Sequence, residues 1–183
     1  MHFMVKYKRN SDLGDIKMNI ETEYKYVVLK PELTKLAAMD GYTESKITQI
    51  YLNNDAATHR VRKREYSSGE VVYTENKKIR ISRMSSTEYE REIDAAEYST
   101  LSENIEDGAS PLYKIRRTFE YGGKVFELDY YDEWKSSCIM EVELDSEDET
   151  VDYPPFIKII ADVTGNKDYS NHRMAHLFPK ELI

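Results

Sequence analysis

Charged side chains of one sign recur at every second position in several segments of this 183-residue chain. Alternation with a period of two is typical of β-strands, in which successive side chains point to opposite faces of a sheet. The segment 59–66 (HRVRKREY) places three arginines on one face, and 87–93 (TEYEREI) places three glutamates on one face. The other face is often apolar or aromatic, as in 138–145 (CIMEVELD). The sequence therefore predicts strands that carry one packed face and one strongly charged face.

The same alternation indicates about eight strands, which are separated by turn-like sequences such as SSGE and YGGK. These segments are 19–29, the region around 47–52, 59–66, 71–83, 87–93, 112–121, 124–131 and 138–145. Helical patterns are fewer and cover 31–41, 94–104, 155–165 and 169–178, the third of them as a short buried helix. We expect one mainly β domain of the α+β class over 18–183, preceded by an extension, 1–17, whose order the sequence leaves open.

Composition excludes several functional classes. The chain carries a net charge of −8, which argues against a nucleic-acid surface held by bulk electrostatics. No apolar run approaches 18 residues, so we expect neither a membrane span nor an export segment. The single cysteine, Cys138, excludes an internal disulfide and fits a reducing cytoplasm. A homodimer is compatible with the sequence, which leaves the oligomeric state open.

The signs of the charges constrain the architecture further. An antiparallel sheet with one solvated face explains any single one of these strands. Several strands that each carry mostly one sign are harder to explain in this way, because like charges repel unless a counter-ion or ligand compensates them. A closed barrel whose charged faces point into a lumen accounts for the whole pattern.

The types of charged residue indicate a ligand for such a lumen. Clustered glutamates suit a hard divalent cation such as Mg²⁺ or Mn²⁺, and clustered arginines and lysines suit phosphate. The sequence has neither GxxxxGK[ST] nor GxGxxG, so side chains rather than a glycine-rich loop would hold the phosphate. Together the two sets predict a site for a metal–polyphosphate complex.

The ordered series of charged motifs resembles the CYTH superfamily, also called triphosphate tunnel metalloenzymes. It begins with Glu21-x-Glu23-x-Lys25, the family's E-x-E-x-K signature, and continues with RVRKR, STEYEREI, FELDYY, MEVELDSEDE and DVTGNKDYSN over roughly 19–175. The resemblance implies a closed eight-stranded antiparallel β-barrel, a tunnel, whose polar charged lumen binds a triphosphate with one or two divalent metal ions. Family activities include inorganic triphosphatase, thiamine triphosphatase, RNA triphosphatase and class IV adenylyl cyclase.

Carried over position by position, the resemblance implies roles for individual lumen residues. The metal-binding and catalytic acids are Glu21, Glu23, Glu141 and Glu143, with Lys25 also counted as catalytic. The phosphate ligands are Lys25, Arg60, Arg62, Lys78 and Arg117, and the further lumen acids are Glu90, Glu92 and Asp129. The implied cofactor is Mg²⁺ or Mn²⁺.

Two positions depart from the family pattern. Asn76 stands where the T-x-K element after the arginine strand has its lysine, and Lys78 restores a cation at the same parity. The family's KTR element is matched to Arg117-Thr118-Phe119. Arg117 keeps the first cation of the element, but Phe119 stands where the family has its arginine. We expect fewer phosphate ligands than the family usually has.

These residues predict a metal-dependent hydrolase that releases phosphate from inorganic tripolyphosphate or a nucleoside triphosphate. A class IV-type adenylyl cyclase is an alternative, but the His-Phe pair that such cyclases carry shortly before the signature lies well upstream here, at His2-Phe3. A non-catalytic polyphosphate- or nucleotide-binding module is a second alternative, which Asn76 and Phe119 favour.

Two further features near the C-terminus invite a functional interpretation. His172 and His176 have the i, i+4 spacing of zinc ligands on a helix, but no HExxH motif or third ligand lies near them in the sequence. We therefore expect these histidines to be surface or satisfied side chains. We likewise expect Lys167 to be a surface lysine.

Overall fold

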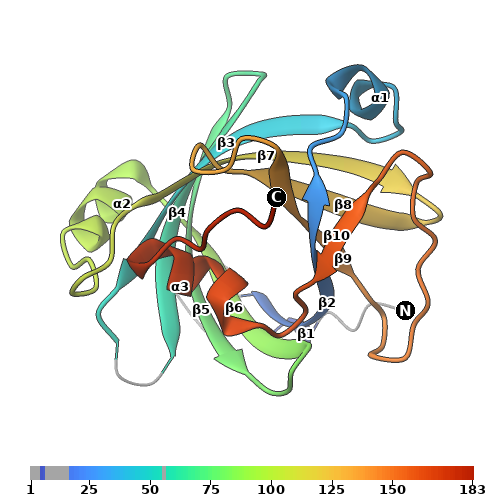
Figure 1. The fold of residues 1–183 in the computed structure, drawn as a ribbon. Helices are drawn as coiled ribbons and strands as arrows, with labels where there is room; N and C mark the ends of the chain where they lie inside the picture. The colour runs from blue at the N-terminus through green and yellow to red at the C-terminus, as the bar shows by residue number, and fades with distance from the viewer. Residues whose placement is uncertain (1–4, 7–16, 55–56) are drawn as a thin grey trace.

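The computed structural model describes residues 5–6, 17–54 and 57–183 (Figure 1). Within these residues the strands are β1 (Val5–Lys6), β2 (Lys17–Leu29), β3 (Thr43–Leu52), β4 (Thr58–Tyr66), β5 (Val71–Arg80), β6 (Ser85–Ile93), β7 (Leu112–Tyr121), β8 (Lys124–Tyr130), β9 (Ser137–Glu143) and β10 (Ile159–Asp162). The helices are α1 (Leu33–Ala37), α2 (Ala95–Ser102), α3 (Asn171–His176) and the 3₁₀-helix η1 (Lys167–Tyr169).

Eight of these strands close into an antiparallel barrel. Their order around the barrel is β2–β6–β5–β4–β3–β7–β8–β9, and β9 returns to pair with β2. Figure 1 shows the strands arranged as a ring, with α3 and the C-terminal segment lying across one end. The eight segments predicted from the alternation are the eight barrel strands, so the expected mainly β closed barrel is confirmed.

Strand β2 closes the barrel by changing partners along its length. Lys17–Thr22 pairs with β6, and Glu23–Leu29 pairs with β9. The pairing with β6 stops at Thr22, which lies opposite Ser85, the first residue of β6. Beyond Thr22, one edge of β2 pairs with β9 and the edge that β6 leaves free pairs with β10. The expectation of a buried helix over 155–165 is wrong, since this segment contains β10 and a turn. Its Ile-Ile sequence is a good strand former, and the open strand edge decided its conformation.

The apolar faces of the barrel strands pack outward against helices and loops. One outer cluster lies under α1 and includes Leu36, Phe119 and Phe126. Another lies under α2 and includes Val61 and Ile93. The predicted start of α2 is confirmed, because the side chain of its N-cap, Asp94, accepts a hydrogen bond of 2.8 Å from the Glu97 amide. None of the helices in the described residues is long and apolar enough to cross a membrane.

A third apolar cluster fills one end of the lumen itself. It contains inward-facing side chains of three strands, namely Val27 of β2, Leu112 of β7 and Ile139 of β9, and also Tyr131, which follows β8. These side chains pack with Trp134 and with residues of β10, η1 and α3. This cluster fills the barrel at that end, and the charged part of the lumen lies next to it, partly covered by the C-terminal segment.

Candidate active site

All eight barrel strands contribute side chains to a cavity of about 550 Å³ in the lumen. This volume lies within the range of about 300–1,000 Å³ that is usual for small-molecule sites. Ten lysine and arginine side chains and seven glutamates line it, so its wall has a positive balance although the whole chain carries −8. The basic residues are Lys25, Arg60, Arg62, Arg64, Lys78, Arg80, Arg83, Arg116, Lys167 and Arg173, and the acidic residues are Glu21, Glu23, Glu88, Glu90, Glu127, Glu141 and Glu143.

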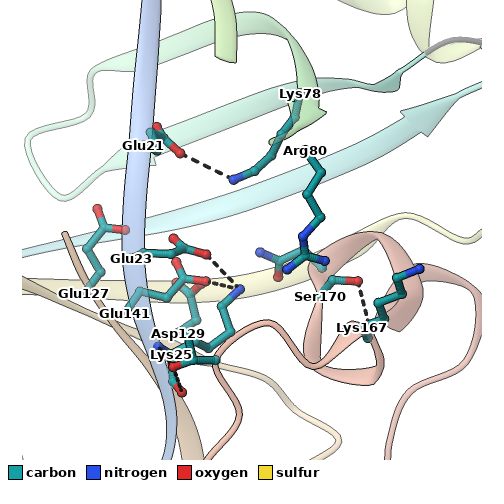
Figure 2. A network of polar contacts seen from close by, with 12 residues as sticks. Glu21, Glu23, Lys25, Lys78, Arg80, Glu127, Asp129, Glu141, Lys167 and Ser170 are labelled. Carbon is teal, nitrogen blue, oxygen red and sulfur yellow. Dashed lines mark hydrogen bonds and ion pairs between the residues drawn. The ribbon is translucent and has the colours of Figure 1, made fainter. Parts of the chain in front are cut away.

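The two signs occupy different arcs of the barrel wall. The glutamates come from β8, β9, β2 and β6, which are consecutive around the barrel, and the bases of the wall come mainly from β7, β4 and β5. Strand β3 lies within the basic arc and contributes the neutral Tyr51. Lys25 on β2 is the exception inside the acidic arc. Figure 2 shows glutamates of β2, β8 and β9 on one side, and Lys78, Arg80 and Lys167 facing them from the other.

A buried layer of ion pairs forms the floor of the cavity, directly above the apolar cluster. Lys25 Nζ lies 2.7 Å from one oxygen of Glu141, and Arg116 Nη2 donates to the other at 3.0 Å. Asp129 accepts from Arg116 at 2.6 Å and from Lys114 at 2.5 Å. Burial opposes ionisation of Glu141, but Lys25 and Arg116 outweigh it and hold the pKa of Glu141 well below its usual range. The floor is therefore charged but internally compensated.

Two carboxyl groups on neighbouring strands, Glu21 and Glu88, share one region of the acidic arc. Glu88 lies 2.6 Å from Lys78 Nζ and accepts from Asn76 at 2.7 Å, and the positive charges of Arg60 and Lys78 lower its pKa despite burial. Burial and the charge of Glu88 raise the pKa of Glu21 to about 8. Its contact with Lys78, at 3.4 Å, is too weak to offset them. Of the two carboxyl groups, Glu21 is therefore the one that more readily takes up a proton.

The arginines of β4 carry donors that the described residues leave unused. The Nε atoms of Arg60 and Arg62 are buried without a hydrogen-bond acceptor. Arg62 has only long contacts, 3.4 Å to Gln49 and 4.0 Å to Glu90. Burial, and after it the neighbouring cations Arg60 and Arg116, lower the pKa of Arg62. Buried donors without acceptors beside a cavity are an anion-binding arrangement.

The segment after β10 covers the cavity from the side of the C-terminus. Arg83 reaches it from the β5–β6 turn and donates through Nε to the carbonyl of Thr164 at 3.0 Å. Lys167 lines the cavity (Figure 2), and so does Arg173 of α3. Lys167 is exposed, as expected of a surface lysine, but it lies at the edge of the cavity because the chain turns back over the barrel at Gly165.

Most of the predicted site residues meet at this cavity. Those that line it are Glu21, Glu23, Lys25, Arg60, Arg62, Lys78, Glu90, Glu141 and Glu143. Asp129 lies beneath the cavity in the buried floor. Glu92 shares a face of β6 with Glu88 and Glu90 but is exposed at the end of the strand and lies outside the cavity.

The prediction for Arg117 is wrong. Its side chain points away from the lumen, donates to Glu44 at 2.9 Å and lies over the ring of Tyr130, 4.2 Å from the centroid. The inward-facing cations of β7 are Lys114 and Arg116 instead, because a shift of one residue moves a side chain to the other face of a strand. Phe119 stacks on Phe126 in the outer core, so it replaces no lumen cation.

On β5 the predicted shift of the cation is what the structure shows. Asn76 and Lys78 both face inward, and Lys78 contacts Glu21 and Glu88. Glu88 itself was not among the predicted site residues, although its parity with Glu90 was a usable signal. Arg83 had no such signal, because it lies in a turn. The His2-Phe3 pair, on which the cyclase alternative rests, lies outside the described residues.

The acidic arc offers a donor set that fits a hard divalent cation. Glu23 and Glu143 are directly opposite each other on β2 and β9, and both line the cavity. Like charges at opposed positions of neighbouring strands destabilise a sheet unless a cation compensates them, and Lys25, whose Nζ lies 3.4 Å from Glu23, supplies part of that compensation. Glu21 lies two residues before Glu23 on the same face of β2, so three carboxyl groups lie within one arc. Oxygen donors of this kind suit Mg²⁺ or Mn²⁺.

Comparison with solved structures finds the same barrel. The inorganic triphosphatase NE1496 matches with a TM-score of 0.56 and 26% identity, over 87% of this chain and 99% of that chain. The PH1819 protein from Pyrococcus horikoshii OT3 shares the fold, with a TM-score of 0.55 and 17% identity over 70% of this chain and 80% of that chain. No protein-family model matches the chain, and no curated protein matches it in sequence.

Proposed function

We propose that this chain, which belongs to the CYTH superfamily by its closed barrel and by the order of its lumen motifs, is a divalent-metal-dependent triphosphatase. The substrate class is inorganic tripolyphosphate or a nucleoside triphosphate, and the product is inorganic phosphate. The similarity to the inorganic triphosphatase NE1496 supports tripolyphosphate as the first substrate to test. The observation that carries the proposal is that arginines with incompletely partnered guanidinium groups, Arg60 and Arg62, line the cavity opposite an acidic wall.

The basic arc binds the phosphate chain in this proposal. Arg60 and Arg62 line the cavity and would contact non-bridging phosphate oxygens, which guanidinium groups match in pairs. Lys78 lies between the two arcs and contacts carboxylates at 2.6 and 3.4 Å, so it is able to bridge the phosphate and the acidic side. Lys167 and Arg173 close the cavity above, where they add positive charge near the opening.

The acidic arc holds the cofactor in this proposal. Glu21, Glu23 and Glu143 would hold Mg²⁺ or Mn²⁺, and a bound ion would neutralise negative charge on the phosphate oxygens. Glu141, also predicted as a metal ligand, is engaged by Lys25 and Arg116 in the floor. Its role here is to fix those two cations at the end of the phosphate chain. The net positive wall attracts a highly charged anion to a chain that is negative overall.

Hydrolysis requires a water molecule to attack the terminal phosphorus in line with the bridging oxygen. The new P–O bond forms as the anhydride bond breaks, and the products from tripolyphosphate are phosphate and pyrophosphate. A lumen carboxylate accepts the proton of the water, and the arginines stabilise the charge that spreads over the equatorial oxygens. Burial excludes competing water and strengthens these contacts. The single buried cysteine, Cys138, is in keeping with a cytoplasmic location for this reaction.

The test is phosphate release from a panel of substrates by the full chain with Mg²⁺ or Mn²⁺. Tripolyphosphate, thiamine triphosphate, ATP and pyrophosphate are compared at equal concentration. The proposal expects turnover of at least one triphosphate and little of pyrophosphate, which is too short to span both arcs. Tight binding of tripolyphosphate without any release of phosphate would instead identify a binding module, and cyclic AMP formed from ATP would identify a cyclase.

A further inference from the structure

A second cluster of ligand-type side chains lies beside the opening of the cavity, and it does not depend on the proposed function. The nitrogen atoms of His172 and His176 and an oxygen of Glu106 all lie within 4.8 Å of one another. His172 Nε2 is 2.7 Å from one oxygen of Glu106, and His176 Nε2 is 3.4 Å from the other. All three side chains are partly exposed, at 22–39% of their accessible surface, so an ion could reach them from solvent.

The backbone holds these three residues in place from two directions. His172 and His176 are one turn apart on α3 and therefore share a face of that helix. Glu106 lies in the turn after α2, where its amide donates to the Tyr51 carbonyl at 2.8 Å. The amide of Ser110 donates to the carbonyl of Ala175 at 2.8 Å, which ties this turn to α3. Among the described residues, the salt bridges of Glu106 are with the two imidazoles.

From this geometry we propose that Glu106, His172 and His176 form a binding site for a divalent transition-metal ion such as Zn²⁺. Two imidazoles and one carboxylate are a donor set that suits borderline ions of this class and is poor for Mg²⁺. Ligand atoms around tetrahedral zinc are separated by roughly 3.3 Å, given metal–ligand distances of about 2.0–2.1 Å. The separations of 2.7 and 3.4 Å between Glu106 and the two imidazoles lie on either side of that value, and the partial exposure of all three side chains leaves other ligand positions open to water.

The site is connected to the cavity through His172. This side chain lines the cavity, and its ring meets the edge of Tyr51, another lining residue, with 4.9 Å between centroids. A metal ion bound here would fix α3, together with Arg173, against the turn that carries Glu106. The site is thus placed to hold the segment after β10, residues 163–176, in position over the lumen; this segment is called the C-terminal cover below.

The experiment is a Zn²⁺ titration of the chelator-treated full chain by calorimetry, in the presence of excess Mg²⁺ to occupy the lumen carboxylates. The proposal predicts one Zn²⁺ per chain, with affinity reduced at least about tenfold in His176→Ala and in Glu106→Gln. The matched control is His59→Ala, which removes an imidazole that bonds to Glu75 on the barrel's outer face and should bind as wild type does.

Two further measurements keep the result decisive. Replacing Zn²⁺ with Co²⁺ should give visible absorption typical of a low-coordinate imidazole site, and this absorption should disappear in His176→Ala. Circular dichroism melting shows whether each variant is folded, and His176→Gln replaces His176→Ala if that variant is not. Equal Zn²⁺ affinity in wild type and the variants, or no binding by wild type in excess Mg²⁺, overturns the proposal. Phosphate release is not a readout here, so failure of the proposed hydrolysis would leave this result unaffected.

Discussion

Arg116 and Arg117 are adjacent in the sequence and lie on opposite sides of the barrel wall. Arg116 joins Asp129 and Glu141 in the floor of the cavity, whereas Arg117 packs on Tyr130 outside. The alternation predicted a strand there, and the match of Arg117 to the family's KTR element placed the inward face one residue too late. Both faces of β7 carry a cation, so the sequence alone did not show which face points inward. The pairing of Arg116 with Asp129 on β8 shows it.

This difference gives a matched pair of variants for the phosphate site. Arg62→Gln removes a largely buried guanidinium group that lines the cavity, and we expect the rate of tripolyphosphate hydrolysis to fall about 10²-fold or more. Arg117→Gln removes an equal charge outside the lumen, and we expect a change of less than about threefold. Steady-state phosphate release measures both. Equal losses in the two variants would contradict the assignment of the inner face.

Glu21 gives a prediction for pH. Its pKa rises from 4.5 to about 8 in the folded protein, so folded chains hold a proton that unfolded chains have lost between these values. In the absence of metal, its contribution to stability should be complete below about pH 4.5 and should decline as pH rises toward 8. Glu21→Gln removes the decline and relieves the repulsion from Glu88. At pH 8 we expect its melting temperature to be at least about 2–4 °C higher, which is about 1 kcal/mol for a chain of this size.

Melting curves of wild type and Glu21→Gln at pH 5, 6, 7 and 8 in EDTA measure this difference. Other groups that titrate in the range affect both proteins and cancel in the comparison. Curves that run parallel across the whole range would show that Glu21 does not keep its proton in the folded chain.

At the scale of elements, β-strands were easier to predict than the segments that cover them. Alternation is a property of each strand alone, so all eight barrel strands were evident in the sequence. The state of 155–165 depended on an open edge of β2 that exists only after the barrel closes. The cluster of Glu106 with His172 and His176 likewise joins residues 66 positions apart, which no spacing rule would bring together.

The turn at Gly165 positions the C-terminal cover, and it gives a prediction at this scale. Gly165 has a φ of +69°, and a Cβ there would lie 2.3 Å from Arg83 Cγ and 2.7 Å from the Arg83 carbonyl oxygen. Gly165→Ala should therefore force the cover away from Arg83. Gly69→Ala is the control, because Gly69 also has a positive φ, +91°, but has no atom within 4 Å of an added Cβ.

Both alanine variants incur the cost of a left-handed residue, about 1–2 kcal/mol. Gly165→Ala should lose at least about 1 kcal/mol more, or a further 2–4 °C in melting temperature. Thermal unfolding followed by circular dichroism compares the two. A loss at Gly165 no greater than that at Gly69 would show that the contact with Arg83 is unimportant.

For the whole molecule, the informative feature is the division of the lumen into an acidic and a basic arc. Each strand's sign was legible in the sequence, and so was the inference that like charges need a common ligand. The order of the strands around the barrel was not, and it is this order that gathers the glutamates of β8, β9, β2 and β6 on one side. A metal–triphosphate complex, with cations at one side and phosphate oxygens at the other, matches a wall of this kind.

The most direct test is the initial rate of phosphate release from tripolyphosphate by the wild-type chain, measured across a Mg²⁺ titration and with EDTA. Glu23→Gln, which removes one of the two opposed carboxylates of β2 and β9, is measured alongside. The account predicts release that depends on Mg²⁺ and stops in EDTA, with half-maximal activation of Glu23→Gln needing at least about tenfold more Mg²⁺. Release that is unchanged in EDTA, or no release at any Mg²⁺ concentration, would contradict it.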